Sequence, residues 1–252
     1  MKSRYRFLDL LRGLNLISMI AYHALYNLNY LYGHPMKWYR STPGYIWQQS
    51  ICWTFIFLSG FCLELGRSDT SHQLRRGLLL TFCGLIITLT TVLVMPDSII
   101  IMGVLSFFGL AVLITALLKP ALNHIPAALG LISSILLFFL TREVNTGWLG
   151  FEHLRILQLP DGLYHSNLMM LLGFPYPGFY STDYFSVLPW IFLFWSGMYT
   201  WKLFSAAGLL PVSFLKKCGF RPLEWIGRHT LLIYMLHQPV LVGIFTLWDF
   251  FN

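Results

Sequence analysis

Charged residues are scarce in this chain, and acidic residues are the scarcest. Of its 252 residues 11% are charged, with 10 Asp and Glu against 17 Lys and Arg. An average soluble domain carries about 25% charged residues, so this composition excludes an ordinary soluble domain. Hydrophobic residues make up 56% of the chain and aromatic residues 17%. These shares are typical of a membrane protein with aromatic belts at the two bilayer interfaces.

Cysteine is also rare, and its spacing excludes several kinds of site. No C-x-x-C pair occurs, and three of the four cysteines lie in apolar segments, which favours buried free thiols over disulfides. The four are Cys52, Cys62, Cys83 and Cys218. A metal bound by His23, His237 and Asp183 would lack tight ligand spacing, so we predict no metal. Internal repeats, low-complexity tracts and a separate soluble domain are absent from the sequence as well.

Long apolar runs, by contrast, are frequent. A spanning helix needs about 20 apolar residues, and seven runs approach that length. We predict an all-α, polytopic integral membrane helical bundle of about seven transmembrane helices, forming one domain over residues 1–252. The predicted spans are Phe7–Tyr32, Tyr45–Leu65, Gly77–Met95, Ser98–Leu118, Ala121–Leu140, Tyr184–Phe204 and Thr230–Phe250.

Lysine and arginine are distributed unevenly between the connecting segments. If the N-terminus is cytoplasmic, 13 of the 17 fall on the inner side and four on the outer side. The positive-inside rule therefore predicts a cytoplasmic N-terminus, and seven spans then place the C-terminus outside. Because the basic residues lie in short loops between spans, we exclude nucleic acid as a partner. Asp9 and Arg12 interrupt the first apolar run, so we interpret it as a retained span and not as a signal peptide.

The first span carries a polar stripe. At about 100° per residue, Arg12, His23 and Asn27 lie within roughly 60° of Asp9 around a helix. Ionisable groups in a spanning helix are costly, so this stripe should face protein or a polar cavity. Asp9 and Arg12 lie one turn apart, and we predict an ion pair between them.

The last span carries a second set of polar residues. Arg228 and His229 stand at its inner end, and His237 follows eight residues later. The preceding inner segment adds Lys216, Lys217 and Arg221. These cations are either a plain orientation signal or a patch that binds phosphate.

The predicted outer segment 141–183 is too long for a simple turn. Its apolar piece Leu168–Phe174 is too short to cross a bilayer and is followed by Pro-Tyr-Pro-Gly. This pattern favours a re-entrant or interfacial element, with a flexible loop as the alternative. Asp183 closes the segment, where it either caps the next helix or contributes to a site.

Several motifs resemble one family along most of the chain. The pattern R-x-R-x-x-D-x-x-R-G, followed by His23, resembles the opening of the membrane acyltransferase superfamily. More closely, the chain is similar to bacterial relatives of the heparan-alpha-glucosaminide N-acetyltransferase catalytic domain. The stretches that carry this resemblance are Arg4–Gly13, Phe55–Phe61, Gly103–Ala111, Gly173–Trp190 and Pro222–Leu241.

The resemblance implies a multi-pass enzyme of the cell membrane. Such an enzyme takes an acetyl or other acyl group from acyl-CoA on the cytoplasmic side. It delivers the group to an amine or hydroxyl of a sugar-type or cell-envelope acceptor on the other side. In the closer group the proposed active histidine falls at His34, whereas the broader superfamily uses a histidine at the position of His23. The resemblance leaves the acceptor and the oligomeric state open, a homodimer included.

We combine these observations in one hypothesis for the site. His23 is the expected catalytic base, with His34 as its rival, because neutral histidine is suited to proton transfer near neutral pH. Asp183 would orient a histidine or bind the acceptor, and His237 would donate to the thioester oxygen. The expected coenzyme A contacts are Arg12, Arg228, His229, Lys216 and Lys217.

Two other classes of protein remain open from the sequence. A small transporter or flippase would use the same buried Asp, Arg and His as a path, although no inverted repeat supports it. A membrane scaffold would use the stripe only as contacts between helices. Binding of coenzyme A would separate the acyltransferase from both.

Overall fold

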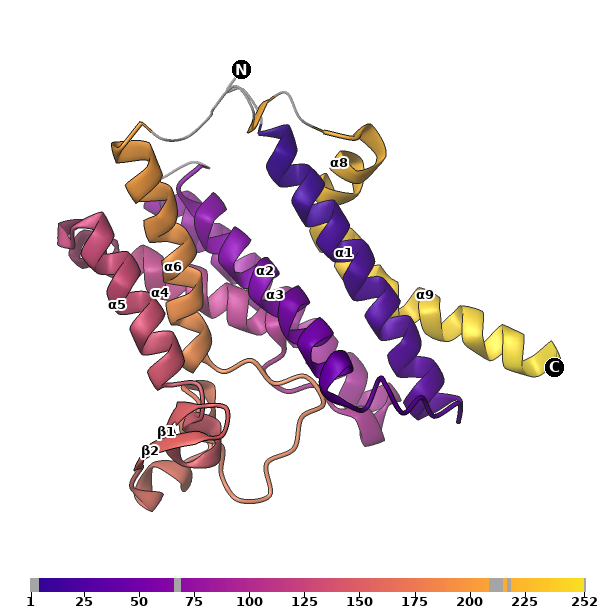
Figure 1. The fold of residues 1–252 in the computed structure, drawn as a ribbon. Helices are drawn as coiled ribbons and strands as arrows, with labels where there is room; N and C mark the ends of the chain where they lie inside the picture. The colour runs from indigo at the N-terminus through magenta and orange to yellow at the C-terminus, as the bar shows by residue number, and fades with distance from the viewer. Residues whose placement is uncertain (1–4, 66–68, 209–214, 217–218, 252) are drawn as a thin grey trace. The chain divides into compact units, whose positions relative to one another are not determined.

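The structure is a computed structural model that is mostly helical (Figure 1). It describes residues 5–65, 69–208, 215–216 and 219–251. The chain forms two compact units, residues 1–58 with 209–252, and residues 59–208. Each unit is described by itself below.

The first unit is built on α1 (Arg6–Tyr26), which continues as the π-helical turn η1 (Asn27–Leu31). Most of α2 (Thr42–Leu63) belongs to this unit, together with α8 (Arg221–Arg228) and α9 (Thr230–Phe251). Both α8 and α9 contact α1, although they lie at the other end of the sequence (Figure 1).

Apolar side chains at helical spacing explain how α1 packs. Leu16 and Met19 lie three residues apart, so they share one face of the helix. Both are buried, and they form a core cluster with Ile51 of α2. Asn15 reinforces this contact because its side-chain amide donates to the carbonyl oxygen of Ile51 at 2.9 Å.

The second unit consists of two helix pairs. α3 (Thr70–Val94) packs along α4 (Val104–His124), and α5 (Ala127–Leu140) packs along α6 (Val187–Ala206) (Figure 1). Small residues permit the close approach in both pairs. In α5, for example, Gly130 faces the ring of Tyr199, and a Cβ atom there would overlap the ring.

The connection from α5 to α6 contains the only strands in the described chain, and no strand was predicted there. β1 (Trp148–Phe151) and β2 (Leu154–Gln158) form an antiparallel hairpin. Short 3-10 turns flank it: η3 (Val144–Thr146), η4 (Asp161–Tyr164) and η5 (Met169–Leu171). The all-α prediction is therefore wrong in this segment. Leu168–Phe174 contains the single 3-10 turn η5, and its placement as a re-entrant or interfacial element stays a prediction.

The predicted boundaries around α4 and α5 are also wrong. The predicted spans Ser98–Leu118 and Ala121–Leu140 leave a break at residues 119–120, but α4 continues through this break to His124. As a result α5 has only 14 residues, which is short for a membrane crossing. A further 3-10 turn, η2 (Pro96–Ser98), lies between α3 and α4.

Among the residues that the structure describes, four helices are long and apolar enough to cross a membrane: α2, α3, α4 and α9. Exposed apolar side chains run along α3 and α9, including Leu78, Phe82, Leu232 and Leu236. In water such surfaces would be unfavourable, whereas lipid is a suitable solvent for them. A multi-pass membrane protein is therefore supported, and the count of seven spans stays a prediction.

Candidate functional site

Two glycines position the elements of the candidate site in the first unit. Gly13 of α1 faces the carbonyl oxygen of Leu223, and Gly227 of α8 faces the carbonyl oxygen of Asp9. A Cβ atom at either glycine would overlap that oxygen. The two backbones can therefore approach closely only because both positions lack a side chain. Each glycine adjoins an arginine, so this contact also brings Arg12 and Arg228 toward the same carboxylate.

Five charged residues form an ion-pair cluster along this contact. Arg12 and Arg228 each lie 3.6 Å from a carboxylate oxygen of Asp9, which is 3% exposed. Arg228 also reaches Glu224 at 3.3 Å, and Arg6 lies 2.9 Å from Glu224. Glu224 is 2% exposed, and a buried carboxylate requires such partners. The hydrogen bonds from Arg6 hold the pKa of Glu224 below its usual range.

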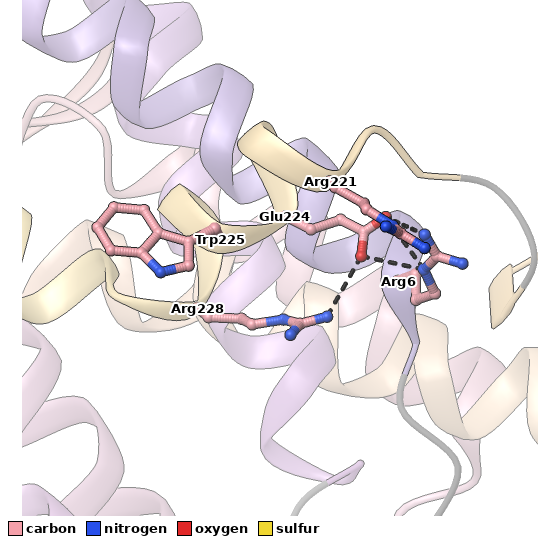
Figure 2. A pocket seen from close by; sticks show the side chains of 5 residues that line it. All are labelled: Arg6, Arg221, Glu224, Trp225 and Arg228. Atoms are coloured by element: carbon pink, nitrogen blue, oxygen red, sulfur yellow. Dashed lines mark hydrogen bonds and ion pairs between the residues drawn. The ribbon is translucent and has the colours of Figure 1, made fainter.

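A pocket of about 370 Å³ opens beside this cluster (Figure 2). Its lining residues are Arg6, Arg221, Glu224, Trp225 and Arg228. Three guanidinium groups against one carboxylate make the lining cationic, and Trp225 adds an aromatic surface that is 58% exposed. Arginine recognises phosphate through paired N–H donors, and an indole ring stacks on planar groups. The pocket is therefore chemically suited to a phosphorylated ligand that carries an aromatic base.

The residues predicted to hold coenzyme A differ in how they relate to this pocket. Arg228 lines it, whereas Arg12 is not among its lining residues and pairs with Asp9. The ring of His229 lies 4.5 Å from that of Trp225, and its Nδ1 contacts the Trp225 carbonyl at 2.8 Å. Lys216 is described but does not line the pocket, and Lys217 lies outside the described residues.

Two histidines from opposite ends of the chain meet further along α1. The ring centroids of His23 in α1 and His237 in α9 lie 4.9 Å apart. Tyr22 and Tyr234 contact the two rings from the sides, with centroids 6.0 Å from His23 and 5.3 Å from His237. The polar stripe of the first span thus faces a polar residue of the last span and not a purely apolar surface.

The hydrogen bonding of His237 decides which of its nitrogens is available. Nδ1 lies 2.5 Å from the carbonyl oxygen of Tyr234, and a carbonyl can only accept. Nδ1 therefore carries the proton in the neutral ring, which leaves the lone pair of the other nitrogen, Nε2, for other use. Nε2 is buried and has no hydrogen-bond partner in the described chain. A buried unpaired nitrogen of this kind is uncommon away from functional sites.

A buried amide pair lies next to the histidines. The side chain of Gln238 donates to Oδ1 of Asn27 at 2.8 Å, and Asn27 is 0% exposed. Asn27 opens the π-helical turn η1, a distortion that is frequent at functional sites. The remaining amide atoms, Nδ2 of Asn27 and Oε1 of Gln238, are buried without partners. Three unpaired polar atoms thus gather around the histidine pair, counting Nε2 of His237.

His34 does not belong to this pair. It is exposed, and its ring contacts that of Trp248 at a centroid distance of 5.7 Å. Trp248 is 11 residues beyond His237 on the continuous helix α9, which corresponds to about 16 Å of rise.

Asp183 lies in the second unit, where it caps a helix other than the one it precedes. Its carboxylate accepts from the backbone N–H of Val104, the first residue of α4, at 3.3 Å. The neighbouring Ser181 and Thr182 bind the same segment through Ile101 and Ile99. Burial raises the pKa of Asp183 to about 6. The S-T-D motif thus fastens residues 98–104, a contact between distant segments that no local pattern indicated.

Two residues of the pocket were not expected from the sequence. Glu224 and Trp225 were inconspicuous in an eight-residue helix, although its arginines and glutamate share a strongly polar face. Arg221 was named only as one of the cations of the inner segment. Gln238 could have been recognised from the sequence, because it adjoins His237 and an amide in an apolar span needs a hydrogen-bond partner.

The comparisons with known proteins found one relationship. A protein-family model described as heparan-alpha-glucosaminide N-acetyltransferase, catalytic, matches residues 4–239. No curated protein and no solved structure matched the chain.

Proposed function

Because the chain belongs to the heparan-alpha-glucosaminide N-acetyltransferase catalytic family, we propose that it is a membrane-embedded acetyltransferase that uses acyl-CoA. The donor would bind from the cytoplasmic side, and the acceptor would be an amine or hydroxyl of a sugar-type compound on the outer side. The observation that carries this proposal is the contact of His23 with His237, beside an unpaired Nε2. A bacterial cell membrane is the proposed location.

The chemistry needs a proton acceptor at the histidine pair. The acceptor nitrogen or oxygen attacks the carbonyl carbon of the thioester, and the carbon–sulfur bond then breaks. The proton lost by the attacking atom passes through a histidine to the departing thiolate of coenzyme A. We assign Nε2 of His237 as the first proton acceptor, because its lone pair is free, and His23 as its partner in the transfer. This assignment reverses the donor role expected for His237 from sequence.

The cationic pocket of Figure 2 is the proposed phosphate site for the donor. Arg221 and Arg228 would hold phosphates, and Trp225 would stack on the adenine. From Asp9 to His23 the helix rises about 21 Å over 14 residues. Only a ligand with a long, thin arm would connect the pocket with the histidines, and the pantetheine arm of coenzyme A has that form.

Nothing in the described chain favours the transporter alternative. The pocket residues instead allow a direct test of donor binding. Arg221→Gln should weaken binding of acetyl-CoA to the detergent-purified protein, and Arg75→Gln is the matched control on an exposed site of α3. Donor binding should raise the melting temperature, with a stabilisation of about 2.7 kcal/mol at 100 times Kd. An unchanged melting temperature at saturating acetyl-CoA would contradict the donor assignment.

The catalytic assignment is tested with three alanine variants. His23→Ala and His237→Ala should each lower kcat by about 10²–10⁴, the usual contribution of a general base. His34→Ala is the matched control, because His34 is exposed and contacts Trp248. Radiolabelled acetyl transfer to a panel of amino sugars is the measurement. If His34→Ala is inactive while His237→Ala retains full activity, the assignment is wrong.

A further inference from the structure

The apolar helix α5 is too short to cross a bilayer by itself. Its 14 residues rise about 21 Å, whereas the hydrocarbon core of a bilayer is about 30 Å thick. A helix of this length that starts at one face of the core ends about 9 Å before the other face. If α5 crosses the membrane, the segment that follows it must lie within this remaining thickness.

An apolar stripe runs along one side of α5. Four large apolar residues recur there at helical spacing and are exposed: Leu129, Ile132, Leu136 and Phe139. Another side of α5 packs against α6, where the ring centroids of Phe138 and Trp190 lie 5.8 Å apart. In a multi-pass membrane protein an exposed apolar stripe of this kind is suited to contact with acyl chains.

The stripe continues onto the hairpin of β1 and β2, which lies beyond the end of α5 (Figure 1). The ring of Phe139 contacts that of Phe151 in β1 at a centroid distance of 4.8 Å. Phe151 in turn pairs with Leu154 of β2, and residues opposite each other in an antiparallel pair share one face. Apolar contacts therefore lead from the exposed side of α5 to β2.

Every residue of β2 is exposed, although three of the five are large and apolar. Leu154, Ile156 and Leu157 are 65%, 61% and 58% exposed. Ile156 is the extra residue where the register shifts, so the bulge leaves it without a partner across the hairpin. An exposed apolar edge strand in water promotes aggregation, so this surface requires an apolar neighbour.

The charged residues of the hairpin indicate that this neighbour is lipid. Arg142, directly after α5, pairs with Glu152 of the hairpin turn at 3.9 Å and lies over the Trp190 ring at 4.8 Å. Arg155 of β2 lies over the Trp148 ring at 5.3 Å. Tryptophan and arginine side chains anchor segments at the boundary between acyl chains and headgroups. The hairpin thus combines apolar side chains with the residues typical of a bilayer interface.

The open edge of β2 limits the depth of the hairpin. In the described chain β2 pairs with β1 alone, so the backbone groups along its other edge need water or headgroups as partners. An open sheet edge does not occur among acyl chains. The backbone of β2 must therefore lie at the level of the headgroups, while its apolar side chains extend into the adjacent part of the acyl chains.

We propose that the β1–β2 hairpin is an interfacial anchor that inserts Leu154, Ile156 and Leu157 into the lipid leaflet at the end of α5. The hairpin thereby completes a crossing for which α5 alone is too short. The loop charges predict that this is the outer leaflet. The inference does not depend on the proposed acyl transfer.

A fluorescent label on β2 tests this depth. In the full chain the four native cysteines are replaced by alanine, and single cysteines are introduced by Ile156→Cys, Leu136→Cys or Asn167→Cys. Each protein is labelled with bimane and reconstituted in vesicles of phosphatidylcholine and phosphatidylglycerol. The quenchers are a lipid with a doxyl group near the headgroup, a lipid with a doxyl group near the chain end, and iodide in the water.

The label at Ile156 should be quenched at least twofold more by the shallow doxyl lipid than by the deep one. Iodide should quench it at least threefold less than the label at Asn167, which is exposed in the same connection. Leu136 is the control for a deep position, since it lies about 15 Å along α5, and it should show the reverse order of the two lipids.

Three results would overturn the inference. Equal iodide quenching at Ile156 and Asn167 would place β2 in water. Quenching of the Ile156 label by neither lipid would show that protein covers it. A Leu136 label that is no deeper than the Ile156 label would show that the hairpin does not complete a crossing.

A charged substitution tests the contact with acyl chains. In the protein labelled at Ile156, Leu154→Glu should raise iodide quenching at least twofold, because a carboxylate draws this end of β2 toward water. Asn167→Glu is the matched control and should leave the quenching unchanged, since Asn167 is polar and exposed. If Leu154→Glu behaves like Asn167→Glu, Leu154 does not contact acyl chains and the inference fails.

Discussion

Gly227 of α8 lies against the backbone of Asp9 in α1, so close that a single methyl group would overlap the carbonyl oxygen of Asp9. Gly13 has the same relationship to Leu223 in the opposite direction. This reciprocal contact joins the two ends of the chain and places Arg228 within 3.6 Å of the buried Asp9 carboxylate.

Gly227→Ala should therefore destabilise the first unit. The added methyl group must push α8 away from α1, and overpacking of this kind costs about 1–3 kcal/mol. Gly243→Ala in α9 is the matched control, because the space around Gly243 is open. Removal of a helical glycine should stabilise the control by about 0.5–1 kcal/mol. Thermal unfolding in detergent measures both changes, and a Gly227→Ala melting temperature at or above that of the unmodified protein would contradict the contact.

Gln238→Leu should leave Oδ1 of Asn27 buried and unpaired. An unsatisfied buried acceptor costs about 1–3 kcal/mol. The double variant Asn27→Leu, Gln238→Leu removes both partners and should be less destabilised than the sum of the two single variants. Unfolding of all four proteins gives the coupling energy, which averages about 0.6 kcal/mol between membrane helices. Strict additivity would mean that the two amides do not interact.

Asp183 should reveal its role through two substitutions. Asn retains an acceptor for the Val104 N–H without the buried charge, whereas Ala removes the cap at a cost of about 1 kcal/mol. The pKa of Asp183 is raised to about 6 by burial, so the folded state binds the proton more tightly than the unfolded state. The stability contributed by the protonated form is complete below about pH 4 and is lost as the pH rises through 6.

Asp183→Asn should abolish this loss and be more stable than the unmodified protein at pH 7.5. Melting temperatures between pH 4 and 8 test the sign. Acetyl transfer by the same variant separates the two interpretations of Asp183, since a pure cap predicts normal activity and an acceptor-binding carboxylate predicts its loss.

The polar residues of the first span were predictable because a helix has a fixed period. Asp9, Arg12, His23 and Asn27 were placed on one stripe by spacing alone, and a buried charge in an apolar run demands an explanation. Spacing alone does not identify the residues that contact these side chains. Only the packing of α9 against α1 brings His237 to within 4.9 Å of His23 and shows that His34 is elsewhere.

Other features had no sufficient local signal. β1 and β2 are four and five residues long, too short for an alternating pattern to stand out from the surrounding apolar sequence. A proline inside a helix removes a backbone donor and usually kinks or ends the helix. Nevertheless, α4 continues beyond Pro120 to His124. The Nδ1 atom of His124 lies 2.6 Å from the carbonyl oxygen of Pro120. Packing against α3 and α6 outweighs the local preference there.

Glu224 should make the stability of the first unit depend on pH in the acidic range. The hydrogen bonds from Arg6 lower the pKa of Glu224 in the folded state, so the unfolded state binds a proton more readily. The stability from this pair is therefore present above the unfolded pKa, about 4.3, and is lost as the pH falls through the lower folded value.

Glu224→Gln should be less stable than the unmodified protein at pH 7. This difference should shrink steadily below about pH 4, whereas Asp97→Asn should match the unmodified protein at pH 7. Melting temperatures across pH 3–7 provide the measurement. A Glu224→Gln deficit that stays constant down to pH 3 would show that the carboxylate contributes by packing and not by its charge.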